Sequence, residues 1–152
     1  MPEAGVERTL VLVKPDGVRR GLMGTVVSRL EAKGFTIVAA RLLRVSPATA
    51  EVHYAEHRGK PFYPDLVAFI TSAPVLALAV QGRGAIAAVR ALIGATNPLS
   101  AAPGTVRGDL GLAVTSNLVH ASDSPASASR ELSLFFRPEE FAEYTRCDAE
   151  YL

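Results

Sequence analysis

The sequence predicts an α+β fold, a ferredoxin-like split βαβ sandwich in which helices cover a four-stranded antiparallel sheet and a helical pair is inserted after the second strand. Three observations predict it. Apolar runs typical of strands alternate with segments of helical periodicity in the order β-α-β, two helices, then β-α-loop-β-α. The length of 152 residues suits one compact domain, 1–152. Hydrophobic residues make up 49% of the chain, which is enough to form a core.

The first elements are two strands separated by a helix. Residues 8–13 are leucine-rich and β-branched and end at Lys14-Pro-Asp-Gly17, so we expect a buried strand followed by a turn. Apolar residues then recur at helical spacing from Leu22 and stop at Gly34, which predicts the first helix. The apolar stretch 35–45 predicts the second strand.

Prolines mark the boundaries of the inserted helical pair. Ser46-Pro47 supplies an N-cap and a proline at the first helical position, so we expect a helix from there to about His57. A second short helix is expected around residues 66–70, because its apolar residues have helical spacing and Pro74 follows.

The second half of the chain repeats the strand and helix pattern around a long irregular segment. Residues 75–80 predict the third strand and residues 84–93 a helix. The segment 94–116 has no periodicity, and an irregular segment of that length in a compact domain is usually a functional loop. A short strand over 117–121 and a helix from Ser124-Pro125 to about Phe136 complete the fold.

Charge and composition exclude several classes of protein. Residues 139–150 hold five acids and one base, which leaves 15 basic and 10 acidic residues elsewhere, an excess that suits a nucleotide better than a long nucleic acid. The single cysteine, Cys147, excludes an internal disulfide. No apolar run approaches the roughly 18 residues of a membrane span, and residues 1–7 lack the pattern of a signal peptide. We therefore expect a cytoplasmic protein without a membrane partner.

Two short patterns have ordinary explanations. The stretch Gly82-Arg-Gly84-Ala-Ile-Ala87 matches a dinucleotide-binding fingerprint, but the acidic residue expected about 20 residues later is missing, so a plain strand-to-helix turn is favoured. His53 and His57 lie four apart on a helix and could face one metal ion. The residues between them differ from the H-E-x-x-H pattern and no third ligand is evident, so a solvated pair on the helix surface is favoured.

The third histidine, His120, has a more informative context. It lies near the end of a predicted strand and just before a capped helix, where side chains point into a cleft and backbone N–H groups are free. A strand-end histidine alone is more often structural. The glycine-rich loop 103–109, which contains Arg107, and the turn 14–17 are the features that favour a functional role.

Several blocks of the sequence together resemble the nucleoside diphosphate kinase family. In order, they are Glu7-Arg-Thr9, Lys14-Pro-Asp-Gly-Val18 with Arg20-Gly21, His53-Tyr54, Lys60-Pro-Phe62, Thr96-Asn-Pro98, Pro103-Gly-Thr-Val-Arg-Gly-Asp109 and Asn117-Leu-Val-His-Ala-Ser-Asp-Ser124. The resemblance runs from about Glu7 to Tyr144, with Ala121 in place of a frequent glycine and Phe135-Phe136 in place of a frequent tryptophan-containing pair. It implies transfer of the γ-phosphoryl group from a nucleoside triphosphate to a nucleoside diphosphate, by a ping-pong mechanism through a phosphohistidine at His120.

The resemblance also implies a role for each of the other site residues. Glu131 would orient the imidazole of His120, Tyr54 would reach the catalytic region and Ser122 would lie close to the nucleophile. The phosphate ligands would be Lys14, which is also counted as catalytic, together with Arg90, Thr96 and Arg107. The sugar and base would contact Asn117, Phe62, Leu66 and Val114.

The implied cofactor and assembly follow from the same resemblance. Mg²⁺ would be held by the nucleotide phosphates and water, so we expect no direct metal ligand from the protein. The chain would form a homo-oligomer, a hexamer with a tetramer as the alternative, because the acidic extension 138–152 offers Phe141, Tyr144, Tyr151 and Leu152 for burial against a neighbour. The alternative for that extension is a frayed, solvated tail.

A binding module without turnover is the alternative function. Such a protein would be a nucleotide sensor or a ferredoxin-like nucleic-acid module. The aromatic RNA-binding motif of those modules is absent, and every matched catalytic position carries the residue of the kinase family. We therefore expect an enzyme with no specific nucleic-acid partner.

Overall fold

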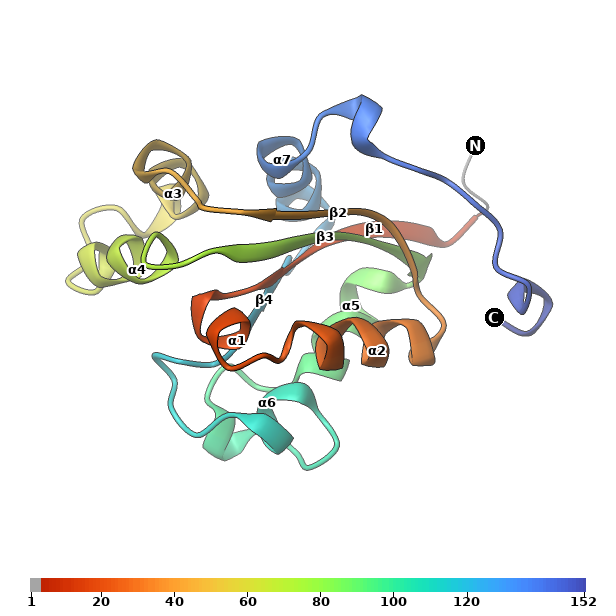
Figure 1. The fold of residues 1–152 in the computed structure, drawn as a ribbon, viewed down its shortest axis with the longest axis horizontal. Helices are drawn as coiled ribbons and strands as arrows, with labels where there is room; N and C mark the ends of the chain where they lie inside the picture. Colours follow the sequence, from red (N-terminus) through yellow and green to blue (C-terminus); the bar gives the residue numbers. More distant parts are fainter. Residues whose placement is uncertain (1–3) are drawn as a thin grey trace.

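One antiparallel sheet of four strands organises the computed structural model, which describes residues 4–152 (Figure 1). The strands are β1 (Val6–Val13), β2 (Thr36–Leu43), β3 (Val75–Arg83) and β4 (Val119–Ala121), and they lie in the order β2-β3-β1-β4. All three strand pairs are antiparallel, and β1 and β2 are separated by β3. This is the split βαβ topology, so the predicted fold class is confirmed.

Helices cover both faces of the sheet. The helices are α1 (Pro15–Arg19), α2 (Met23–Lys33), α3 (Pro47–His53), α4 (Tyr63–Ile70), α5 (Ala85–Ile93), α6 (Val106–Leu110) and α7 (Pro125–Phe135). Short 3₁₀ turns cover Ala55–His57, Pro98–Ser100, Pro138–Glu140 and Ala149–Tyr151. Figure 1 shows α2 and α5 on one side of the sheet and α7 on the other, with α3 and α4 beyond one end.

The central strand β1 divides the core into two layers. Val11 and Val13 pack in the cluster that includes α2 and α5, whereas Leu10 and Leu12 pack in the cluster that includes α7. Successive side chains of a strand point to opposite faces, and all four residues are fully buried. A strand that is covered on both faces has a nearly continuous apolar sequence, and this pattern in residues 8–13 predicts a buried strand.

The predicted helix caps are confirmed in their geometry. Gly34 ends α2 with φ of 117°, a left-handed conformation that favours glycine. The hydroxyl of Ser46 accepts a hydrogen bond from the Thr49 N–H at the start of α3, and that of Ser124 accepts one from the Ser127 N–H at the start of α7. These caps fix the helices that carry His53 and Glu131.

Several predicted boundaries were wrong. Residues 14–17 were expected to form a turn, but they begin the short helix α1, because Pro15 at the first helical position favours helix. The helix expected to reach about His57 ends at His53 and continues as a 3₁₀ turn. The segment 94–116 is not wholly irregular: it contains a 3₁₀ turn and α6, whose N-cap Thr105 accepts a hydrogen bond from the Gly108 N–H.

Two further features match or refine the predictions. Gly84 has φ of 55° at the N-cap of α5 and forms the strand-to-helix turn, whereas Gly82 lies within β3, where a Cβ would be 2.7 Å from the Phe35 ring. Both glycines therefore have structural explanations. No helix within residues 4–152 is long and apolar enough to cross a membrane. The part of the signal-peptide argument that rests on Met1–Glu3 lies outside the described residues.

The C-terminal extension folds back on its own chain. The Ala142 N–H donates a hydrogen bond to the Val38 carbonyl (2.7 Å), and the Arg146 guanidinium donates to the carbonyls of Glu31 (2.9 Å) and Phe35 (2.8 Å). The ring centroids of Phe141 and Phe136 are 5.8 Å apart, so Phe141 is used within the chain. The alternative of a frayed tail is therefore wrong, and burial of the extension against a neighbour stays a prediction.

Truncation after Arg137 should destabilise the isolated chain. It removes Ala142, Arg146 and Phe141, and with them the contacts just described, for a loss of about 2 kcal/mol. The thermal midpoint should fall by roughly 4–8 °C in differential scanning calorimetry. A change of the exposed Glu51 on α3 to Gln is the control, and it should leave the midpoint unchanged. An unaltered midpoint after truncation would show that these contacts contribute nothing to stability.

Candidate active site

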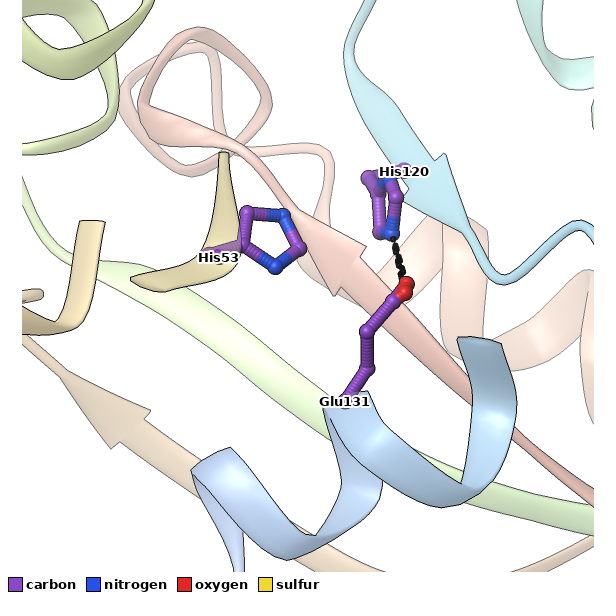
Figure 2. A group of neighbouring side chains, drawn as sticks. All are labelled: His53, His120 and Glu131. Carbon is purple, nitrogen blue, oxygen red and sulfur yellow. Dashed lines mark hydrogen bonds and ion pairs between the residues drawn. The ribbon is translucent and has the colours of Figure 1, made fainter. Parts of the chain in front are cut away.

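His120 and Glu131 form the centre of the candidate site (Figure 2). His120 lies on β4 opposite Leu12 of β1, and Glu131 projects from α7. The Nε2 atom of His120 is 2.7 Å from Oε1 and 3.2 Å from Oε2 of Glu131. A carboxylate accepts, so Nε2 carries the proton, and a neutral imidazole with its proton on Nε2 has its lone pair on Nδ1. The geometry therefore makes Nδ1 the nucleophilic nitrogen.

Burial and a serine fix the position of the Glu131 carboxylate. Glu131 is 3% exposed, whereas the His120 side chain is 29% exposed and accessible from outside. The fully buried Ser122 hydroxyl lies 3.3 and 3.4 Å from the two carboxylate oxygens and donates to them, while the Leu10 N–H lies 3.4 Å from Ser122 Oγ. The predicted neighbours of the nucleophile, Glu131 and Ser122, are thus brought together with it.

His53 is a neighbour of His120 and not a surface residue. It is 4% exposed, and its ring centroid lies 4.8 Å from that of His120 with the planes at 80°. Its ring also packs edge-on against Tyr54 at 4.7 Å and Phe135 at 5.6 Å. Burial, followed by the charges around it, lowers the pKa of His53 to about 3. The prediction of a solvated pair with His57 was wrong, because α7 and β4 cover the helix face that carries His53.

Tyr54 keeps its hydroxyl proton in this environment. Burial, and secondly the negative charge of Glu131, raises the pKa of Tyr54 to about 12. The phenol is therefore a hydrogen-bond donor at neutral pH.

Lys14 provides a partly desolvated cation at the end of β1. Burial lowers its pKa from 10.5 to about 8; Asp16 opposes this shift and Arg107 adds to it. No acidic side chain in residues 4–152 forms an ion pair with Lys14, and its ammonium lies 5.6 Å from the centroid of the Phe69 ring. A bound anion would therefore stabilise the charged form of Lys14.

Arg107 connects the long loop to the strand that carries the nucleophile. Its guanidinium donates to the carbonyls of Asn117 (3.2 Å), Gly94 (3.0 Å) and Val119 (2.7 Å), and the side chain is buried. Burial, and secondly the nearby Arg90, lowers its pKa to about 10. A guanidinium has five N–H groups, so two stay available for another acceptor. The sequence pointed to phosphate binding only, and this structural role was missed.

Backbone strain just before His120 is a second feature that the sequence did not reveal. Leu118 has φ of 74°, the only positive φ outside glycine in the described residues. Its N–H donates to the Asp16 carboxylate (2.9 Å), and its carbonyl accepts from the Lys14 N–H (2.8 Å). A Cβ on Gly17 would lie 3.0 Å from that carbonyl oxygen. Residues 14–17 therefore hold the strained residue in place.

Comparison with known proteins places this arrangement in a family. The family model described as nucleoside diphosphate kinase matches residues 7–141. The chain belongs to the nucleoside diphosphate kinase family. A nucleoside diphosphate kinase of Archaeoglobus fulgidus is 57% identical over 147 residues, covering 97% of each chain. One of Moorella thermoacetica is 57% identical over 135 residues, which cover 89% of this chain and 97% of the relative.

Solved structures of the family have the same fold. The structure of a halophilic nucleoside diphosphate kinase from Halobacterium salinarum in complex with CDP matches with a TM-score of 0.93 at 47% identity, covering 95% of this chain and 97% of that one. The chain is accordingly a nucleoside diphosphate kinase, an enzyme that moves a phosphoryl group from a nucleoside triphosphate to a nucleoside diphosphate. These findings support the enzyme over the alternative of a binding module.

The predicted sugar and phosphate residues of the kinase lie next to Arg107. The Asn117 side chain is buried; its Nδ2 donates to the Thr96 carbonyl (2.9 Å), and its Oδ1 has no hydrogen-bond partner. Thr96 itself is exposed. Nη1 of Arg90, also exposed, donates to the Ala121 carbonyl at 3.0 Å. An unpaired buried acceptor is costly, so Asn117 Oδ1 is suited to an incoming hydroxyl.

The predicted base-binding residues of the kinase come from two separate segments. Phe62, at the N-cap of α4, is 47% exposed, and Val114, after α6, is 52% exposed. Leu66 is half-buried on α4. The Phe62 ring centroid lies 5.5 Å from that of His57 and 5.7 Å from the Lys60 ammonium, and about half of the Phe62 side chain remains exposed.

Proposed function

We propose that His120 carries the phosphoryl group between the two nucleotides. Nδ1 attacks the γ-phosphorus of a nucleoside triphosphate, the bond to the β,γ-bridging oxygen breaks, and the nucleoside diphosphate leaves. A terminal phosphate oxygen of a second nucleoside diphosphate then attacks the phosphorus, and the N–P bond breaks. The hydrogen bond between Nε2 and Glu131 carries this proposal, because it directs the lone pair to Nδ1.

Cations and donors around His120 would stabilise the phosphoryl group in transit. We assign this role to Lys14, Arg90, Arg107 and Thr96. Their support is the desolvated ammonium of Lys14, the two unused N–H groups of Arg107 and the closeness of all four to the ends of β1 and β4. The protonated hydroxyl of Tyr54 would add a donor near the reacting atoms.

The sugar would bind at Asn117 and the base between Phe62, Leu66 and Val114. The unpaired Oδ1 of Asn117 can accept from a sugar hydroxyl. Stacking on apolar side chains carries no hydrogen-bond code for the base. That a relative is described in complex with CDP is consistent with a nucleoside diphosphate site.

Because the proposed base site is formed by the apolar side chains of Phe62, Leu66 and Val114, the enzyme should accept nucleotides with different bases. ATP, GTP, CTP and UTP should serve as phosphoryl donors with kcat/KM within about two orders of magnitude, because only weak apolar contacts address the base. Steady-state kinetics with each donor against one fixed acceptor measures this. A preference of about 10⁴-fold or more for one base would instead require polar contacts to it.

The family uses a divalent cation, and we propose Mg²⁺ bound to the nucleotide phosphates. The donor set of this chain supports that assignment: the one group of three potential ligands in residues 4–152 contains two imidazoles, whereas Mg²⁺ prefers oxygen. When bound, Mg²⁺ neutralises charge on the phosphates. The protein's own contribution is the placement of Lys14, Arg107 and His120 around them.

We also propose that residues 1–152 act as one catalytic domain that assembles into a cytoplasmic homo-oligomer, a hexamer or a tetramer. Exposed Tyr144, Tyr151 and Leu152 of the C-terminal extension support assembly, since they leave apolar surface uncovered. Light scattering should give a mass near six chains, or near four for the alternative. A monomer with full activity would contradict the proposal.

A labelling experiment tests the phosphohistidine directly. The enzyme, mixed with a γ-labelled nucleoside triphosphate and no acceptor, should take up close to one acid-labile phosphoryl group per chain. Addition of unlabelled nucleoside diphosphate should remove the label as nucleoside triphosphate. Full activity without labelled protein would mean direct transfer between nucleotides.

Lys14 should impose an alkaline limit on this reaction. Its pKa is lowered to about 8 in the free protein, so the ammonium that pairs with phosphate is lost as the pH rises through that value. kcat/KM of the wild type should therefore fall above about pH 8, and the advantage over Lys14→Met should be large near pH 7 and small near pH 9.5. Lys33→Met, a change of an exposed lysine on α2, is the matched control. A constant ratio of the two enzymes across pH would contradict the assignment.

A further inference from the structure

Three side chains around the nucleophile form a group of potential metal ligands (Figure 2). His53 comes from α3, His120 from β4 and Glu131 from α7, and one ligand atom of each lies within 4.8 Å of the others. No other such group of three occurs in residues 4–152. The sequence did not reveal it, because the two partners of His53, which lie on β4 and α7, come far later in the chain.

His53 is the member of this group that phosphoryl transfer leaves unused. It is 4% exposed, and neither of its buried ring nitrogens has a hydrogen-bond partner. Figure 2 shows the edge of its ring turned toward His120. Buried polar atoms normally have a partner, and a neutral imidazole has one lone pair to offer. The unpartnered ring therefore points to a ligand that binds between the two histidines.

We propose that a transition-metal cation such as Zn²⁺ binds to His53, His120 and Glu131 and inhibits the enzyme. Two imidazoles and one carboxylate, with a fourth position left for water, is a ligand set that Zn²⁺ favours. The exposed side of His120 gives the cation and this water access. Mg²⁺ needs about six oxygen ligands, so the cation that accompanies the nucleotide does not compete for this site.

Binding requires a modest closure of the three side chains. Zn²⁺ bonds of about 2.0–2.2 Å place neighbouring ligand atoms roughly 3.3–3.5 Å apart. The contact between Nε2 of His120 and Oε1 of Glu131, now 2.7 Å, would lengthen as the cation replaces the shared proton. His53 would move toward the cation, and no hydrogen bond of its side chain opposes that movement.

The tautomer of His120 explains why such binding would inhibit. A metal on Nε2 uses the lone pair of that nitrogen, so the single proton of the neutral ring must reside on Nδ1. The proton moves from Nε2 to Nδ1 by exchange with water, and no net proton is released. Nδ1 then has no lone pair with which to attack phosphorus. The metal thus reverses the arrangement that the hydrogen bond to Glu131 establishes.

Cobalt titration of the nucleotide-free, untagged enzyme tests the binding. After removal of metal with a chelator, Co²⁺ should bind one ion per chain with the visible absorption of a four-coordinate site, and Zn²⁺ should displace it. His53→Phe removes both nitrogens from an aromatic environment and should weaken Zn²⁺ binding by at least about tenfold. His53→Gln serves if the phenylalanine variant fails to fold. His57→Gln, which removes a histidine outside the group, should bind as tightly as the wild type.

Inhibition is measured in the same variants with Mg²⁺ in large excess. The Zn²⁺ concentration for half inhibition should rise at least about tenfold in His53→Phe and stay unchanged in His57→Gln. The proposal would be overturned if His53→Phe bound Co²⁺ and Zn²⁺ as tightly as the wild type does. It would also be overturned if Zn²⁺ inhibited both enzymes at the same concentration, which is the result expected if Zn²⁺ acted by replacing Mg²⁺ on the nucleotide. Because binding is measured without nucleotide, a failure to form phosphohistidine would not alter that result.

Discussion

His120→Ala should lower kcat by more than about 10⁴-fold, because it removes the atom that would carry the phosphoryl group. The fold should remain, since the His120 side chain is 29% exposed and its polar contacts are with Glu131 alone. The variant should still bind nucleotide, because the proposed ligands Lys14, Arg107 and Asn117 are unchanged. Calorimetry measures this binding. A coupled assay of nucleoside triphosphate formation gives the rate.

Glu131→Gln is the graded companion to that variant. It keeps the shape of the side chain, but the carboxylate that accepts the Nε2 proton is lost, so kcat should fall by about 10–100-fold and remain above that of His120→Ala. If His120→Ala kept more than a few per cent of the wild-type rate, His120 would not be the nucleophile. If Glu131→Gln had the wild-type rate, the orientation of the ring by Glu131 would be irrelevant to the reaction.

Arg107→Ala should have the second largest effect, and on two properties at once. It removes the hydrogen bonds that the guanidinium donates to the carbonyls of Gly94, Asn117 and Val119, and the free energy of unfolding should fall by about 3 kcal/mol or more. It also removes a cation proposed to contact the phosphates, so kcat/KM should fall by about 10²–10³-fold. Urea denaturation and steady-state kinetics measure the two losses separately.

Arg107→Lys separates the structural contribution from the charge. Lysine keeps the positive charge but lacks the planar fork that reaches three carbonyls, so most of the stability loss should persist while part of kcat/KM returns. Wild-type stability of Arg107→Ala would show that the three hydrogen bonds are not structural. Reduced stability with an unchanged kcat/KM per folded molecule would remove Arg107 from the phosphate site.

The parts of the fold that depend on local patterns were predictable from the sequence. Strand β1 was predictable because it is buried on both faces, and the starts of α3 and α7 because serine and proline mark them. The five-residue helices α1 and α6 were not predicted, since so short a helix shows no periodicity. Helix α6 depends on its N-cap Thr105, and α1 is held by the hydrogen bonds of residues 14–16 with the distant Leu118.

The site was predictable in its residues but not in its geometry. Motif resemblance gave His120 and Glu131, and the structure brings them together. The position of His53 could not be predicted, because the helix spacing does not show which face α7 and β4 will cover. The positive φ of Leu118 was also hidden, since leucine rarely adopts it and Asp16, which holds its N–H, lies 102 residues earlier in the chain.

The segment Lys14–Gly17 has an evolutionary consequence, because each of its four residues has a separate task. Lys14 supplies a charge, Pro15 begins α1, Asp16 holds the Leu118 N–H, and Gly17 leaves room for the Leu118 carbonyl. No one of these tasks can be taken over by a neighbour in the same stretch. Random mutation followed by selection for kinase activity should therefore leave this tetrapeptide almost unchanged while nearby surface positions diverge. A descendant that lost it would need to support the nucleophile from a different part of the chain.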